Sequence, residues 1–350
     1  MARDRNSSIE ILRILAMVMI VVGHFGVQSL IATAGDPCNR AVVGFIGSGG
    51  RLAVNIFLLI GTWFMVDAPF RPERIIKIYL QVALYTIPLT ILMIVLGMAG
   101  DARNIIQGLL PFFGRPLWFA TAYISLIALT PFLNQVFRLD NVNLGRLVGV
   151  LLFCFSAVST IPSFTAAEYP AELAWFLLVY IFMGWAKRTM FFDRLPSKWW
   201  SFALGFGILF ALSAARKVPG VDWAASYWLD HLPTLPNFIV AVLIFNFFRS
   251  VNLGSVRIVN WMSSSVFAVY IVHQTPAFRE CLWNVLWRAE TLASAPRVFF
   301  VVWLFAMLMA LFMIVTAIDR IYRIRLQRLI ERSSLYERAL LSLNRIYCNL

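Results

Sequence analysis

Arg13 and His24 interrupt the first long apolar segment of the chain, Ile9–Ile31. Ionisable side chains inside a membrane helix are costly and usually functional. Eleven residues make about three helical turns, so both side chains project from nearly one stripe, about 16 Å apart along the axis. This stripe predicts a site that lines a path through the membrane. The alternative is that Arg13 reaches the lipid headgroups and His24 forms a structural bond to a neighbouring helix.

The chain has only three histidines, His24, His231 and His273. The topology derived below places all three toward the outer side of the membrane. Histidine is the side chain best suited to proton transfer near neutral pH. The position of the histidines therefore predicts proton transfer in the outer half of the membrane. For His273 the alternative is a satisfied residue at a helix end, and His231, between Asp230 and Leu232, is expected at the surface.

A basic edge opens the third apolar segment, where Arg71, Arg74 and Lys77 follow one another at i, i+3 and i+6. Arginine and the start of a helix both favour anions, so a phosphate can be held there. The alternative is that these charges only mark the cytoplasmic side of the membrane.

Other signals narrow the chemistry. The run Gly47–Arg51 lacks the Gly-Lys-Ser/Thr end of a phosphate-binding loop, so we expect it to give a close backbone approach or a bend. Arg51 and Asn55, four residues apart, place two polar groups on one helix face. The sequence contains no metal-ligand spacing, no Gly-x-Ser-x-Gly elbow, no paired-carboxylate signature and no dinucleotide-binding fingerprint. Glu10 is nearly the only acid expected inside a span, which argues against an ion-coupled transporter.

The elements that position these residues are membrane helices. Hydrophobic residues make up 61% of the 350 residues and charged residues 13%, and the mean hydropathy is +0.79. A soluble core cannot hide that much apolar side chain. The first segment is too long for a secretory signal and is interrupted by Arg13 and His24. Ser7 and Glu10 have capping-box spacing, which suits a retained helix.

We expect an all-α, polytopic bundle of about ten transmembrane helices. The expected spans are Ile9–Ile31, Ala41–Met65, Ile75–Gly97, Leu117–Val136, Leu147–Ile161, Leu173–Ala186, Trp200–Ala214, Leu235–Phe248, Ile258–Thr275 and Val298–Ile318. The stretch Ile105–Phe113 is too short to span and is expected to be re-entrant or to lie on the surface.

The charge distribution predicts that both termini are cytoplasmic. With the N-terminus inside, twenty Lys and Arg residues fall on the inner side and nine on the outer side. The net charge of +13 is therefore a topology signal, and no nucleic-acid motif accompanies it. Residues 1–318 form one membrane domain. The tail, Asp319–Leu350, with seven arginines, is expected to be a basic amphipathic helix on the inner leaflet.

The four cysteines form no metal or redox motif. Cys38 and Cys281 both fall in segments expected outside, so a disulfide between them stays open.

The chain resembles the acyltransferase-3 family of membrane-bound acyltransferases, and most closely its surface-polysaccharide O-acyltransferases. The similarity rests on five motifs in order along most of the chain: Ile9–Ala16 with Val22–Phe25, Ala53–Gly61, Arg71–Tyr85, Leu117–Phe119 with Tyr123 and Pro131–Asn134, and Tyr270–His273 with Pro276. One position departs from the family pattern, since Ile60 stands where a serine usually precedes Gly61. We expect no esterase-like domain of the kind that some relatives carry.

The resemblance implies transfer of an acyl group, expected to be acetyl, from cytoplasmic acyl-CoA to a hydroxyl of an extracytoplasmic polysaccharide or glycan precursor. It makes His24 the base for the acceptor hydroxyl, or else a transient acyl carrier. It implies that Arg13 orients the CoA arm. Arg71 and Arg74, with Lys77 beside them, meet its phosphates. Further residues line the substrate path: Glu10, Asn55, Trp118, Tyr123, Tyr270 and His273.

Acetyl-CoA is thus a donor rather than a bound cofactor, no metal is expected, and the partners are acyl-CoA, a glycan or lipid-linked sugar, and membrane lipids. The expected location is a bacterial inner membrane. Two alternatives remain open. One is a transporter or flippase of an envelope metabolite, and the other is an acyltransferase that acts on a small molecule. The acyl group, the acceptor and the oligomeric state are not determined by the sequence.

Overall fold

The computed structural model describes residues 6–29, 31, 36–112, 116–161 and 172–347. It is all-helical, with 81% helix and no strand in these ranges, which confirms the predicted fold class. The chain divides into two compact units. Unit 1 is Met1–Gly23, Phe45–Pro69 and Leu129–Asn260; unit 2 is His24–Gly44, Phe70–Ala128 and Trp261–Leu350.

Seven helical stretches among the described residues are long and apolar enough to cross a membrane. They are Ser7–Gln28, Pro37–Met65, Glu73–Val95, Trp118–Val136, Asn141–Thr160, Lys198–Ala215 and Arg297–Ile330. An eighth is added if the bent pair Asp222–Asp230 and Leu235–Ser250, with an angle of 57° between its helices, counts as one span. The protein is therefore a multi-pass membrane protein. The total of about ten spans stays a prediction.

Unit 1 is built around α12 (Leu235–Ser250), which contacts α4 (Gly50–Met65) and α10 (Lys198–Ala215). Nearly every residue from Asn237 to Phe248 is buried, as expected for a helix that is covered all round. The other helices of this unit are α8 (Asn141–Leu152), continued by short turns to Thr160, α9 (Glu172–Arg188) and α11 (Asp222–Asp230).

Asp140 caps the first turn of α8. Its side chain accepts hydrogen bonds from the backbone N–H groups of Val142 and Asn143. These bonds and the one from the Asn143 amide lower the pKa of Asp140, the largest effect being that of the Asn143 backbone. The cap stabilises the helix start just before the apolar run.

The segment expected as one helix over Ala41–Met65 is two helices, α3 (Pro37–Gly47) and α4. The break falls at Ser48 and Gly49, where the chain has little preference for helix. A Cβ on Gly47 would lie 2.8 Å from the Cα of Gly23 in α1 (Ser7–Gln28). The two backbones therefore approach as closely as only glycine permits, one residue before His24.

Unit 2 contains α5 (Glu73–Val95), the short α6 (Ala102–Leu109) and most of α7 (Trp118–Val136). Residues 105–109 of the stretch expected over Ile105–Phe113 lie in α6, and Phe113 lies outside the described residues. Helix α6 contacts α5, and its 8 residues are too few to cross a membrane. Further helices are α15 (Pro276–Glu280), a π-helical turn Cys281–Leu286 (η5), and α16 (Ala289–Ala293).

The expected span Ile258–Thr275 is also interrupted, giving α13 (Arg257–Ser263) and α14 (Val266–Gln274). Three consecutive serines lie at the break. The Ser264 hydroxyl donates to the Trp261 carbonyl and the Ser265 hydroxyl to a carboxylate of Asp319. Such side-chain bonds compete with the helical backbone and favour its interruption.

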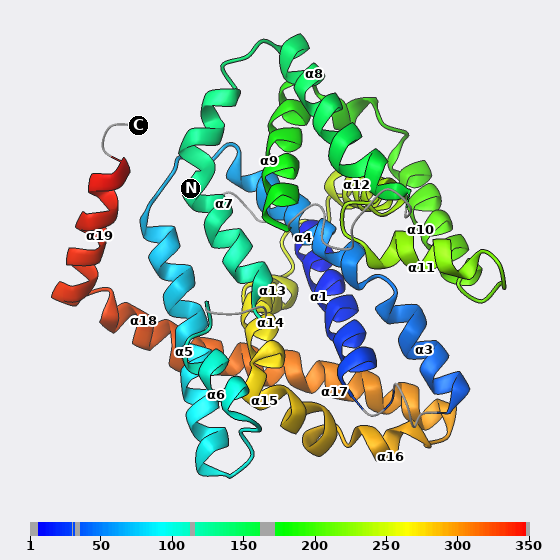
Figure 1. Ribbon diagram of the computed structural model, residues 1–350, viewed down its shortest axis with the longest axis vertical. Helices are drawn as coiled ribbons and strands as arrows, with labels where there is room; N and C mark the ends of the chain where they lie inside the picture. Colours follow the sequence, from blue (N-terminus) through cyan, green and yellow to red (C-terminus); the bar gives the residue numbers. More distant parts are fainter. Residues whose placement is uncertain (1–5, 30, 32–35, 113–115, 162–171, 348–350) are drawn as a thin grey trace. The chain divides into compact units, whose positions relative to one another are not determined.

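The tail differs from the single amphipathic helix that we expected. Helix α17 (Arg297–Ile318) continues through a π-helical turn, Asp319–Arg323 (η6), into α18 (Ile324–Ile330), and only α19 (Ser334–Tyr347) is separate (Figure 1). Helix α19 has no buried residue, as an amphipathic surface helix requires. A domain boundary at Ile318 stays a prediction, since the helix runs through it.

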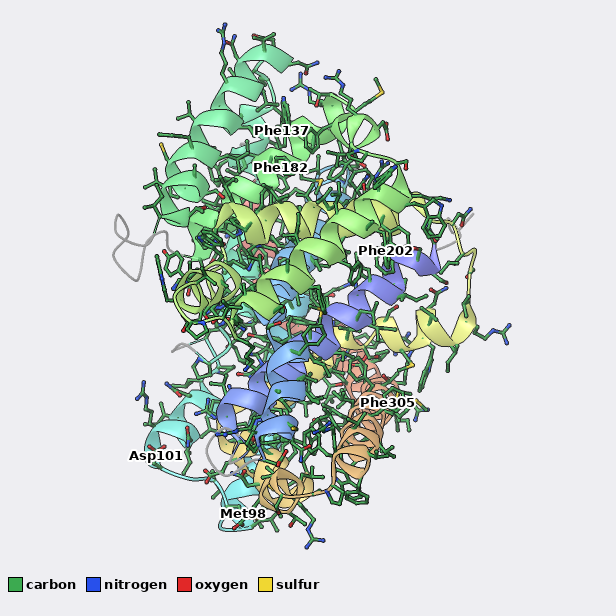
Figure 2. The ribbon with its side chains drawn as sticks, turned by 90° about the vertical axis from the view of Figure 1, so that its right-hand side faces the viewer. Met98, Asp101, Phe137, Phe182, Phe202 and Phe305 are labelled. Atoms are coloured by element: carbon green, nitrogen blue, oxygen red, sulfur yellow. The ribbon has the colours of Figure 1, made fainter. Side chains whose placement is uncertain are left out.

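Large apolar side chains remain exposed on helices of both units. Phe202 on α10 is 39% exposed and Phe305 on α17 is 64% exposed (Figure 2). Soluble proteins rarely expose rows of such residues, whereas lipid-facing helices do.

Candidate functional site

The two histidines of unit 2, His24 on α1 and His273 on α14, are directly hydrogen-bonded. The Nδ1 atom of His24 lies 2.9 Å from the Nε2 atom of His273, and the ring centroids are 5.2 Å apart. His273 is completely buried, whereas His24 is half-buried. The structure therefore joins two of the predicted site residues that are 249 positions apart in the sequence.

A backbone carbonyl determines the protonation pattern of this pair. The Nδ1 atom of His273 lies 2.7 Å from the carbonyl oxygen of Val269. Because a carbonyl only accepts, Nδ1 of His273 carries the proton, and Nε2 of the neutral ring is an acceptor. His24 then donates its Nδ1–H to His273, which leaves the lone pair of the neutral His24 ring on Nε2. This tautomer is the one that a general base or a nucleophile needs.

A shell of amides and aromatic rings surrounds the pair. Gln28, one turn after His24, lies 3.4 Å from Gln274 and accepts a 3.2 Å hydrogen bond from the indole N–H of Trp283. The Trp283 ring is fully buried and packs against the His273 and Phe25 rings at 6.1 and 5.7 Å. These contacts hold the two imidazoles in place.

Sequence reasoning missed Gln28, Gln274 and Trp283. The only signals were local ones: Gln28 is four residues from His24, and Gln274 follows His273. Trp283 lies in a segment that was expected outside the membrane, and it carries no such signal.

The predicted aromatic residues of α7 are linked to His273 through Tyr270. Tyr270, one turn before His273 on α14, packs edge-on against it at 6.0 Å and against Phe119 at 5.7 Å. Phe119 in turn contacts Trp118 and stacks on Tyr123 at 5.9 Å. The structure thus brings Trp118, Tyr123 and Tyr270 into one aromatic group beside His273, through Phe119, which belonged to a quoted motif but was not proposed for the site.

Arg13 forms an ion pair on its own helix. Its Nη1 atom lies 2.8 Å from the Oε2 atom of Glu10, whose side chain is 7% exposed. The sequence proposed both residues for the substrate path but not their pairing. The pair neutralises Arg13, so any anion that binds there competes with a buried carboxylate.

Asn55 is tied into the packing of unit 1. Its amide nitrogen donates to the Leu232 carbonyl and the Asn237 side chain, and its oxygen accepts from Trp175 at 2.7 Å. Both of its N–H groups are used, so its observed role is to join α4, α9 and the start of α12. His231 is half-buried, follows α11, and contacts Tyr227 on that helix.

The basic edge starts α5, as expected. Arg71 and Lys77 are exposed and Arg74 is half-buried. Lys77 lies 3.8 Å from Glu331 of the tail. A cavity of about 960 Å³ adjoins the edge, lined by Ile75, Ile76 and Tyr79 of α5 and by residues of α7, α18 and α19.

A buried carboxylate at the end of α17 was not anticipated. Asp319, 1% exposed, accepts hydrogen bonds from Tyr85 at 2.7 Å and Ser265 at 2.9 Å, and pairs with Arg323 at 2.8 Å. With four donor atoms around it, the charge is satisfied. Hydropathy alone placed Asp319 in the tail, so its burial could not be seen.

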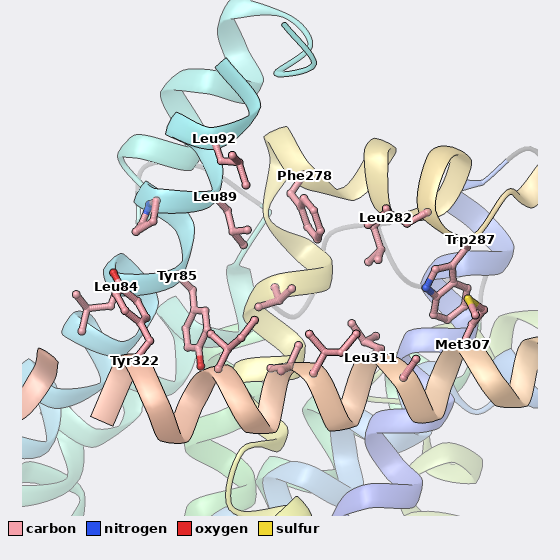
Figure 3. Close-up of a pocket in the computed structure, with 17 residues that line it drawn as sticks. Leu84, Tyr85, Leu89, Leu92, Phe278, Leu282, Trp287, Met307, Leu311 and Tyr322 are labelled. Atoms are coloured by element: carbon pink, nitrogen blue, oxygen red, sulfur yellow. The ribbon is translucent and has the colours of Figure 1, made fainter. Parts of the chain in front are cut away.

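An apolar cavity of about 440 Å³ includes Tyr85 of this cluster in its lining. Figure 3 shows the residues that line it. Leu84, Tyr85 and Leu89 of α5 face Leu311 of α17 across it, and Trp287 lies at one end. Its walls can hold a hydrocarbon chain but offer no titratable group except the tyrosine hydroxyls.

Two further expectations concern cysteines and metals. Cys38 and Cys281 are free thiols, the latter buried, so the structure contains no disulfide between them. Within the described ranges, no group of three or more His, Cys, Asp or Glu side chains is arranged to hold a metal ion.

The comparisons with known proteins found a match at the level of a sequence family. The sequence model of a family described as an acyltransferase domain matches residues 6–319. No curated protein matches the chain, and no solved structure does.

Proposed function

The chain belongs to the acyltransferase-3 family, and from this premise we propose that it is a surface-polysaccharide O-acyltransferase. It moves an acyl group, acetyl in our proposal, from cytoplasmic acyl-CoA to a hydroxyl of an extracytoplasmic polysaccharide or glycan precursor. The observation that carries the proposal is the hydrogen-bonded pair His24–His273, whose tautomer leaves a basic nitrogen on His24.

In the proposed step, Nε2 of His24 takes the proton of the acceptor hydroxyl as its oxygen attacks the thioester carbonyl carbon. The C–S bond breaks, and the CoA thiolate takes the proton back from His24. His273 accepts the His24 Nδ1–H bond throughout and so stabilises the imidazolium that forms. The route through an acyl-His24 intermediate uses the same nitrogen as the nucleophile.

The acyl donor is a large anion, and the start of α5 is the proposed place for its phosphates. Arg71 and Arg74, with Lys77, supply the positive charge, and the adjoining cavity supplies space for the rest of a large ligand. Arg13, on the same helix as His24, is proposed to orient the CoA arm within the bundle.

The proposed setting is a bacterial inner membrane, crossed about ten times, with both termini in the cytoplasm. The basic residues support this orientation because most of them fall on the inner side. In it, the His24 end of α1 faces outward, where a glycan hydroxyl arrives, and the start of α5 faces inward, where acyl-CoA is found.

Purified protein in proteoliposomes tests the proposal. Radiolabelled acetyl-CoA is supplied with a glycan acceptor mixture, and both CoA release and label on the acceptor are measured. The wild type is expected to produce both. The variant His24→Ala is expected to lose about 10²–10⁴-fold in rate, which is the usual contribution of a general base.

His231→Ala is the matched control, because His231 belongs to unit 1, where it contacts Tyr227, and the pair belongs to unit 2. It is expected to keep wild-type transfer. If the folded wild type transfers no acyl group from acetyl-CoA or from longer acyl-CoA donors, the acyltransferase proposal is wrong and a transporter becomes the better account.

A further inference from the structure

The buried carboxylate of Asp319 joins α5, α14 and the end of α17 within unit 2. Its Oδ1 atom accepts a hydrogen bond of 2.7 Å from the Tyr85 hydroxyl, which points from α5 toward α17 (Figure 3). Its Oδ2 atom accepts one of 2.9 Å from the Ser265 hydroxyl at the start of α14. Arg323 donates to both oxygens at 2.8 Å. Each oxygen therefore accepts one hydroxyl and one guanidinium N–H, and a buried network satisfied in this way is rigid.

The Ser265 hydroxyl is directed away from its own helix. Ser265 directly precedes α14 and is fully buried, yet its side chain forms no capping bond to α14, all of whose residues are described. Serine in this position usually accepts a hydrogen bond from the first turn of the helix. Here its hydroxyl donates to Asp319 instead, so the carboxylate fixes the start of α14. Negative charge beside a helix N-terminus also stabilises the helix.

The turn before α14 makes this attachment important. The chain at Ser264 and Ser265 is a turn, so α14 does not receive its direction from α13 through a continuous helical backbone. A second side-chain bond ties the same turn to the end of α17, because Arg320 donates from Nη2 to the Ser264 hydroxyl at 2.9 Å. The start of α14 is thus held by side chains that follow α17.

Hydrogen bonds connect the start of α14 to the histidine pair. The Ser265 carbonyl accepts the Val269 N–H at 3.1 Å. The Val269 carbonyl accepts the Nδ1–H of His273 at 2.7 Å, and Nε2 of His273 lies 2.9 Å from Nδ1 of His24. Two helical turns, about 12 Å, separate Ser265 from His273. The carbonyl that determines the tautomer of both rings therefore lies on the short helix whose start Asp319 holds.

We propose that Asp319 is a positioning residue for acyl transfer. Through Ser265 it fixes α14 relative to α5 and α17, and α14 presents His273 to His24 in the geometry that leaves a basic nitrogen on His24. The inference rests on the proposed function. It adds to that function a carboxylate that acts through the histidine pair and contacts neither the acyl donor nor the acceptor.

Ser265→Ala is the decisive variant. Replacing Asp319 itself would leave the charge of Arg323 without its partner, whereas Ser265→Ala removes the bond to α14 and keeps the ion pair. The full-length variant is assayed in proteoliposomes with radiolabelled acetyl-CoA and the glycan acceptor mixture. We expect kcat to fall about 5–20-fold, because a small misplacement of a catalytic group can cost up to about 10²-fold. KM for acetyl-CoA is expected to change little.

Tyr85→Phe is the matched control. It removes the other hydroxyl that Asp319 accepts, on α5 rather than α14, and keeps the ring. Both variants lose one hydrogen bond to the same buried carboxylate, so both are expected to lower the melting temperature by similar amounts. Only Ser265→Ala is expected to lower kcat. An equal loss of kcat in the two variants would show that the network only stabilises the fold, and would overturn the inference.

A double variant tests whether Ser265 acts through the histidine. Ser265→Ala combined with His273→Ala is expected to have the kcat of His273→Ala alone, since the position of a missing ring has no effect. Losses that multiply would place the effect elsewhere in the fold and overturn the inference. A wild type that transfers acyl groups beside an equally active Ser265→Ala overturns the inference alone. A wild type without acyl transfer overturns the proposed function and this inference together.

Discussion

Two histidines from distant parts of the chain share one hydrogen bond, and the direction of that bond follows from a single backbone carbonyl. Val269 accepts the Nδ1–H of His273, so His273 in turn accepts from His24. The half-buried His24 ring thereby keeps its basic nitrogen, Nε2, while the fully buried His273 ring holds it in position. His273 is therefore a positioning residue in this account, and its contribution is separable from that of His24.

Replacing His273 by alanine is expected to lower kcat by about 10–10²-fold, because the imidazole of His24 loses the acceptor that fixes its tautomer. KM for acyl-CoA is expected to stay within about twofold, since His273 touches no proposed phosphate contact. The pH–rate profile is the further readout, and its basic-group pKa should move when the acceptor is lost. An unchanged kcat and an unchanged profile would show that the hydrogen bond is only structural.

At the scale of elements, the helix that carries His24 is held by close backbone packing. A Cβ atom on Gly47 would lie only 2.8 Å from the Cα atom of Gly23. Backbone atoms cannot move aside as the end of a flexible side chain can. Gly44, on the same helix as Gly47, has nothing within 4 Å of its Cβ position. The two glycines therefore separate the effect of close packing from that of helix propensity.

Gly47→Ala is expected to force α1 and α3 apart, lowering the melting temperature and the transfer rate together. Overpacking of this kind typically costs about 1–3 kcal/mol. Gly44→Ala, the control, is expected to be neutral or slightly stabilising, because alanine favours helix over glycine by up to about 1 kcal/mol. Thermal unfolding of the detergent-solubilised variants checks both, and equal melting temperatures for the two would refute the close-packing argument.

At the scale of the whole molecule, hydropathy predicted the all-helical class. It also predicted the bounds of several long helices, such as α1, α5 and α10, to within a few residues. Hydropathy did not predict the break between α13 and α14. It did not predict the one between α3 and α4 either, where the glycine run Gly47–Arg51 had indicated a close backbone approach or a bend. A window average records apolar content and cannot register a local interruption by glycines or serines. The continuation of α17 past Ile318 was hidden for a related reason, since charged residues ended the apolar window although Asp319 and Arg323 neutralise each other.

The candidate site was predictable only in part. The stripe of α1 singled out Arg13 and His24, the outer bias of the histidines singled out His273, and the family resemblance added Tyr270. The hydrogen bond between the histidines and the role of Trp283 depend on contacts between residues far apart in sequence, for which a single sequence holds no signal. The pairing of Arg13 with Glu10 was within reach, because the two are separated by one helical turn.

The proposed topology predicts how introduced cysteines react in cells. Lys217→Cys, in an exposed position after α10, should react with an impermeant thiol reagent added from outside. Ser334→Cys, exposed at the start of α19, should react only after the membrane is opened or inverted. Labelling in a background without native cysteines makes the comparison direct, and the reverse pattern would invert the assignment of donor and acceptor sides.

The central claim is that His24 transfers an acyl group from a cytoplasmic donor to an outer acceptor. The most direct measurement uses inverted membrane vesicles with acceptor glycan trapped in the lumen and labelled acetyl-CoA added only to the bath. The account predicts label on the lumenal glycan with the wild type and at least about 10²-fold less with His24→Ala at equal protein level. Near-wild-type labelling by His24→Ala would contradict it.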